Sequence, residues 1–118
     1  MIRALISLFA LTAAFSAVGQ EYKPLASQYM IYSGSIGDPA PPTKGDAKAS
    51  IVVSGKAAEE IFNQIGPDVR DSCHAEEGGR FRTKAHGAIV CQYSKSDGYV
   101  CYFGLDLKKG RLANASVC

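Results

Sequence analysis

The chain has 118 residues, 47% of them hydrophobic, which is enough apolar material for one small core. Its 13 lysines and arginines stand against 11 aspartates and glutamates. A balance this close gives no overall attraction to nucleic acid or to an anionic membrane surface, and we expect neither as a partner.

Residues 1–19 have the pattern of a signal peptide. Arg3 precedes an apolar run from Ala4 to about Val18, which is shorter than the ~20 residues of a membrane span. Small residues at Ala17 and Gly19 predict cleavage before Gln20. The alternative is an N-terminal membrane tether, and both interpretations place the rest of the chain outside the cytoplasm. We expect a periplasmic or secreted protein without a membrane span after the signal is removed.

The four cysteines indicate two disulfides, because the chain is small and exported. Each bond would stabilise the domain by ~2–4 kcal/mol. The spacing contains no Cys-x-x-Cys pair, so we expect no metal site. Three pairings stay open. Two are favoured equally: Cys91–Cys101 with Cys73–Cys118, and Cys73–Cys91 with Cys101–Cys118. The crossed pairing, Cys73–Cys101 with Cys91–Cys118, is less favoured.

Residues 20–49 are predicted to be an N-terminal arm and a Pro-rich linker. The arm contains Tyr29-Met30-Ile31-Tyr32, a run of strand-forming residues. Three prolines between Pro39 and Pro42 stiffen the segment that follows. Residues 50–118 are then the disulfide-stapled domain.

That domain begins with a short strand at 51–53, which leads into a helix. Ser54 is the expected N-cap, and Gly66-Pro67 ends the helix. Between them, apolar residues recur at helical spacing. They are Ala58, Ile61, Phe62 and Ile65.

The last forty residues are predicted to form a hairpin. Residues 80–93 alternate as a strand, and residues 99–107 form the return strand. We favour a three-residue loop, Ser96-Asp97-Gly98, which sets Lys95 opposite Tyr99. A five-residue loop would instead set Cys91 opposite Cys101. The predicted fold is α+β: one amphipathic helix packed on a small antiparallel sheet of three to five short strands, with two disulfides.

Two groups of polar residues are candidate sites. His74, Glu76 and His86 are the residue types of acid–base hydrolysis, one imidazole acting as base and the other as acid. Alternatively, His74 and its neighbours lie in an exposed loop.

The second group is a basic row at every second residue, which points to one side of a strand. Its members are Arg80, Arg82, Lys84 and His86. Such a row suits an acidic partner or an anionic polymer, although charges on an edge strand also prevent aggregation. The apolar residues Val90, Val100 and Tyr102 point the same way, and we expect the Tyr29–Tyr32 segment to cover them.

We find no nucleophile or cofactor motif, and expect no cofactor. The favoured function is an exported small binding module without catalytic activity, possible examples being an inhibitor or an immunity-type protein of the bacterial envelope. Its partner would be a protein or an anionic polymer of the envelope or extracellular space. The binding residues would be Arg80, Arg82, Lys84, His86 and Tyr102. The alternative is a small secreted hydrolase or nuclease that uses His74 and His86, with Glu76 beside them.

Overall fold

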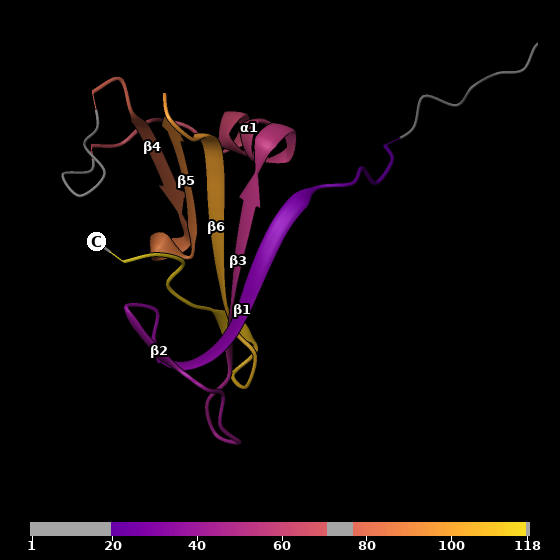
Figure 1. Ribbon diagram of the computed structural model, residues 1–118, viewed down its shortest axis with the longest axis vertical. Coiled ribbons are helices and arrows are strands. Elements are labelled where there is room, and N and C mark those ends of the chain that lie inside the picture. The colour runs from indigo at the N-terminus through magenta and orange to yellow at the C-terminus, as the bar shows by residue number, and fades with distance from the viewer. Residues whose placement is uncertain (1–19, 71–76, 118) are drawn as a thin grey trace, which may run out of the picture.

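The computed structural model describes residues 20–70 and 77–117 (Figure 1). These residues form an α+β fold in which one helix packs on an antiparallel sheet of seven strands. The elements are β1 Ala26–Ser35, β2 Asp38–Ala40, β3 Lys48–Ser54, α1 Gly55–Gln64, β4 Arg80–Lys84, the 3-10 turn η1 Ala85–Gly87, β5 Ile89–Ser94, β6 Gly98–Asp106 and β7 Arg111–Leu112.

The strand order is β2-β1-β3-β6-β5-β4, with β7 paired to the end of β6. The sheet is larger than the three to five strands expected, for two reasons. The segment 26–40 supplies β1 and β2, and β1 pairs with β3 over its first seven residues. The boundary placed at residue 50 therefore falls inside β3.

The second reason is that residues 80–93 are not one strand, as predicted, but a hairpin of β4 and β5 joined by η1. Because of this turn, the side chains of β4 point to the opposite side of the sheet from the one expected. Arg82 lies opposite Cys91, and therefore on the same side of the sheet. The basic residues of β4 thus share a face with the helix, which contradicts the prediction that they lie on the opposite face.

The predicted helix and its buried side are confirmed. Ala58 and Phe62 are fully buried, and Ile61 and Ile65 pack against the same cluster. That cluster includes Val53 and the two disulfide sulfurs on what we call the helix face of the sheet. Ser54 occupies the N-cap position, but its hydroxyl makes no capping hydrogen bond. Gly55 instead turns the chain out of β3 with a φ of 72°, which glycine adopts without strain.

Cys91 and Cys101 form a disulfide between directly opposite residues of β5 and β6. Tyr99 lies opposite Tyr93, and not opposite Lys95 as the favoured loop predicted, so the favoured register was wrong by two residues. Because a shift of two keeps every side chain on its face, the predicted grouping of Ile89, Cys91 and Cys101 still holds. Cys73 and Cys118 lie outside the described residues, and the second disulfide stays a prediction.

The other side of the sheet, which we call the tail face, is crossed by residues 113–117. The Ala113 amide donates to the Gly104 carbonyl and the Ala115 amide to the Gly87 carbonyl, at 3.0 and 2.9 Å. Val90 lies under this tail and the residues around it, and it is buried. The expectation that Tyr29–Tyr32 would cover Val90 was wrong, since β1 pairs edge-on with β3 in the plane of the sheet.

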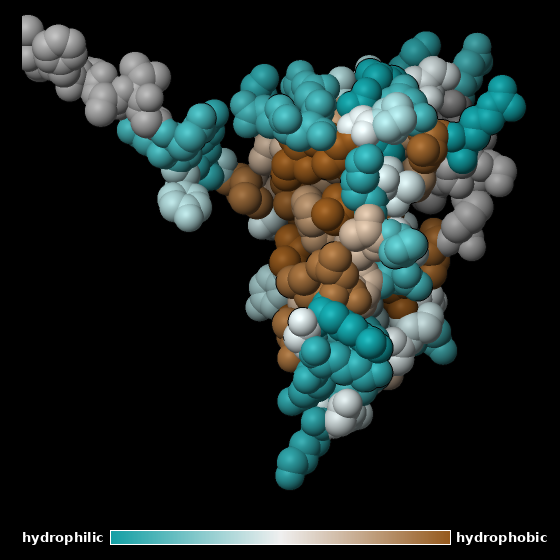
Figure 2. Space-filling model, turned by 180° about the vertical axis from the view of Figure 1, so that it is seen from behind, coloured by the Kyte–Doolittle hydropathy of each residue, from teal (hydrophilic) through white to brown (hydrophobic). Residues whose placement is uncertain are grey.

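The helix α1 covers only one end of the helix face of the sheet. Farther along, Ile51, Phe103 and Leu105 are partly exposed, and Tyr29 and Leu112 more so. Figure 2 shows apolar side chains gathered over the middle of the molecule, between hydrophilic residues above and below.

Candidate functional site

The proposed acid–base group is only partly within the described residues. His74 and Glu76 lie outside them, so their convergence with His86 stays a prediction. His86 is exposed in η1, where its φ of 53° places it in the left-handed region. It therefore does not continue the row of β4 side chains.

The two arginines of β4 are bound to the protein's own groups. Arg80 Nε lies 2.8 Å and Arg82 Nε 2.6 Å from the carboxylate of Asp68. Arg82 also donates from Nη1 to the Phe62 carbonyl at 2.7 Å, and this carbonyl in the last turn of α1 accepts the Ile65 amide as well, at 3.3 Å. Both guanidinium groups lie over the Phe62 ring, at 5.0 and 4.1 Å from its centroid. This arrangement fastens the segment after the helix to the sheet.

These contacts separate the predicted binding residues into two places. Arg80 and Arg82 lie on the helix face, where Arg82 is largely buried. Tyr102 pairs with Val52 and Val90 on the tail face. The five residues therefore do not form one continuous surface, and the binding role of the basic residues stays a prediction.

Replacing Asp68 with asparagine should lower stability at neutral pH and have little effect near pH 2. The hydrogen bond from Arg80, and then that from Arg82, lowers the pKa of Asp68 from 3.8 to about 2. The pKa of Asp68 is lower in the folded protein than in the unfolded chain. The ion pairs with Arg80 and Arg82 therefore stabilise the fold fully above pH 3.8, and this stabilisation is lost as the pH falls toward 2. Urea titrations of Asp68→Asn and the unchanged protein at both pH values measure the difference.

The matched control is Asp97→Asn, which removes a carboxylate from the exposed β5–β6 turn. It should leave the urea midpoint unchanged. A loss of stability in Asp68→Asn that is equally large at neutral pH and near pH 2 would show that the ion pairs do not carry it.

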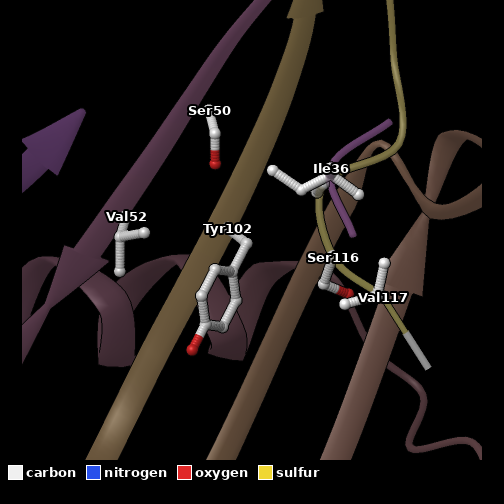
Figure 3. Close-up of a pocket in the computed structure, with 7 residues that line it drawn as sticks. Ile36, Ser50, Val52, Tyr102, Ser116 and Val117 are labelled. Atoms are coloured by element: carbon white, nitrogen blue, oxygen red, sulfur yellow. The ribbon is translucent and has the colours of Figure 1, made fainter. Parts of the chain in front are cut away.

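The tail face holds an apolar hollow around Tyr102, which we call the Tyr102 groove (Figure 3). It has a volume of about 270 Å³. β3 and β6 form its floor, and Ile36 and the tail form one wall. The lining residues are Ile36, Ser50, Val52, Tyr102, Ala115, Ser116 and Val117. The groove thus combines apolar side chains with the hydroxyls of Ser50, Tyr102 and Ser116.

The sequence builds this groove through Gly104. A Cβ atom at that position would overlap the carbonyl oxygens of Ala113 and Asn114. With no side chain there, the tail backbone lies directly against β6 and forms the wall that carries Ser116 and Val117. The sequence signal was a glycine in the middle of a strand, which often marks a close backbone approach. Gly104 was not recognised in the sequence as such a signal.

A polar hollow of about 320 Å³ adjoins the groove and shares Ile36, Ser116 and Val117 with it. Its polar wall includes Lys48, whose Nζ lies 2.6 Å from Asp46. The hydrogen bond between these groups raises the pKa of Lys48. The pKa of Asp46 is lowered by a hydrogen bond from the Gly34 amide and by Lys48. The two charges are therefore compensated within the protein, and the groove's own lining carries no charged side chain.

Within residues 20–70 and 77–117, no three histidine, cysteine, aspartate or glutamate side chains are grouped as metal ligands. The same residues include no helix that is long and apolar enough to cross a membrane.

Comparisons with family models, curated proteins and solved structures gave no match.

Proposed function

We propose that this chain is an exported binding module of the bacterial envelope or extracellular space, of the inhibitor or immunity type, and that it holds apolar side chains of a partner protein in the Tyr102 groove. The observation that carries the proposal is a concave apolar surface on the antiparallel sheet, with three hydroxyl groups in its lining. Binding sites commonly combine apolar walls with a few polar groups that fix orientation.

The size of the groove favours side chains of a polypeptide over a whole small-molecule ligand. Pockets for such ligands have volumes of roughly 300–1,000 Å³. The 270 Å³ here lies below that range and accommodates one or two apolar side chains. The hydroxyls of Ser50, Tyr102 and Ser116 then serve the backbone of the bound segment.

The uncharged lining adds a second argument about the partner. Placing a charged group there would remove it from water without an opposite charge to pair with. A leucine, valine or phenylalanine side chain meets no such cost. We therefore propose an apolar segment of a protein as the ligand, in place of the anionic partner that the basic row suggested.

Replacing Val52 with tryptophan should fill the groove and weaken the binding of its ligand. Val52 lies on the groove floor, and an indole placed there occupies the space of the ligand side chain. The probe is the tightest-binding peptide selected from a random display library against the purified protein. We expect Val52→Trp to weaken its binding by roughly tenfold or more.

The matched control is Asp97→Trp, which adds the same ring in an exposed turn away from the groove. Equal peptide affinity in Val52→Trp and Asp97→Trp would contradict the proposed site. Cleavage of RNA, DNA or a cell-wall polymer that is lost in the double variant His74→Ala, His86→Ala would contradict the non-catalytic function and support the hydrolase alternative.

A further inference from the structure

Strand β1 leaves one side of its backbone without a partner among the described residues. Its inner side pairs with β3 from Ala26 to Tyr32. On its outer side, β2 pairs only with Ser33, Gly34 and Ser35. Figure 1 shows β1 at the border of the sheet. Along residues 26–32, every second residue therefore directs an unpaired amide and carbonyl outward, and this row is a template for another strand.

This edge lacks the features that usually keep sheet edges apart. Proteins protect such edges with lysine, proline, bulges or very short strands. Residues 26–32 contain no charged residue and no proline. Three large apolar side chains in the same stretch are exposed: Tyr29 at 77%, Met30 at 38% and Ile31 at 39%. An open edge of this composition is a surface on which another strand can pair.

We propose that a second copy of this chain covers the edge by antiparallel pairing of β1 with the partner's β1. A two-fold axis normal to the sheet relates the strands, so each face of one sheet continues into the same face of the other. β2 closes the edge after Tyr32, which limits the overlap. The one register that overlaps all seven residues 26–32 is centred on Tyr29 and sets it opposite the partner's Tyr29.

The composition of the strand suits this self-pairing. Because residues 24–37 carry no charge, two copies meet without like-charge repulsion. The central pair is two tyrosines, and directly opposite aromatic residues stabilise antiparallel strands. Beside it on the helix face, Ile31 lies opposite the partner's Ser27. The pairing leaves the floor and walls of the Tyr102 groove free, so this inference and the proposed function fail or succeed separately.

Disulfide trapping tests the register. Directly opposite residues in an antiparallel pair have Cβ atoms about 4.5–5.5 Å apart, close to the separation in a disulfide. After mild oxidation, the variant Tyr29→Cys should give a covalent dimer on a non-reducing gel. In the control Ile31→Cys the two introduced cysteines lie four residues apart along the strands, roughly 13 Å. That variant should stay at the level of the unchanged protein.

Light scattering tests the association itself. The unchanged protein should have the mass of a dimer, and Tyr29→Lys should have the mass of a monomer, because two lysines would then face each other at the axis. Leu107→Lys, an equally drastic change of an exposed residue in the turn after β6, should remain dimeric. A monomer at every concentration up to that of an NMR sample, or trapping as efficient at residue 31 as at residue 29, would overturn the proposal.

Discussion

Replacing Phe62 with alanine is expected to destabilise the domain by about 3–5 kcal/mol, enough to unfold most of a marginally stable protein. Phe62 is fully buried at the centre of the contact between α1 and the sheet. Its ring packs edge-on against Tyr99, with centroids 5.2 Å apart, and supports the Arg82 guanidinium group on its face. Truncation removes these contacts together and leaves a cavity. Denaturant titration followed by circular dichroism measures the loss.

The control for Phe62→Ala is Glu59→Ala on the outer side of the same helix. Glu59 makes one long ion pair with Lys56, at 3.8 Å between exposed groups. Exposed pairs of this kind contribute little, so the midpoint should hardly move. Equal losses in Phe62→Ala and Glu59→Ala would mean that the helix does not anchor the fold through the face described.

Replacing Gly104 with alanine should cost about 1–3 kcal/mol or more and displace the tail from the sheet. The added methyl group would overlap backbone oxygens of Ala113 and Asn114, which have no rotamer to move away. Separation of the tail from β6 breaks its hydrogen bonds to Gly104 of β6 and to Gly87 of η1, and it exposes Ala115, which is buried in the fold. Denaturant titration and hydrogen exchange at the Ala113 and Ala115 amides measure both effects.

The matched control is Gly45→Ala, since a Cβ atom at Gly45 meets no other atom within 4 Å. Its stability and its tail amides should be unchanged. Because the tail forms a wall of the Tyr102 groove, Gly104→Ala should also lose peptide binding. Full stability together with protected tail amides in Gly104→Ala would contradict the described packing of the tail.

The helix was the element that the sequence predicted best. Its apolar residues recur at 3.6-residue spacing and end at Gly66-Pro67, and this periodicity needs no knowledge of the rest of the fold. The side of the sheet on which each β5 and β6 residue lies was also predicted correctly, because side chains alternate between the two sides along a strand. Their register was off by two residues, which leaves each side chain on the same face.

The basic row was misplaced because of an unusual turn. Ala85 and His86 both adopt positive φ values, near 54°, in the turn between β4 and β5. Residues other than glycine seldom do so, and no local pattern marked this stretch as a turn. Once the chain reverses there, Arg82 faces the helix. Its partner Asp68 is 14 residues away and becomes visible only in the folded chain.

Among the lining residues of the groove, only Tyr102 was predicted as a binding residue, and the signal at Gly104 was not recognised. Its floor comes from β3 and β6, and its walls come from Ile36 and the tail, which are far apart along the chain. The pairing of β3 with β6 forms the floor, and the crossing of the tail over Gly104 brings Ser116 and Val117 to it. Strand periodicity placed Tyr102 correctly on the face opposite Cys101, but it does not say what lies above that face.

Chemical-shift mapping by NMR tests most directly whether the Tyr102 groove binds an apolar side chain. The probe is N-acetyl-leucine methylamide, added to the isotope-labelled protein at the millimolar concentrations that suit so small a ligand. We expect saturable shifts of the Val52, Tyr102 and Ser116 amides, and no saturable shift at Arg82 or Lys84. Saturable shifts confined to Arg80–Lys84, or none anywhere in the protein, would contradict the proposed binding site.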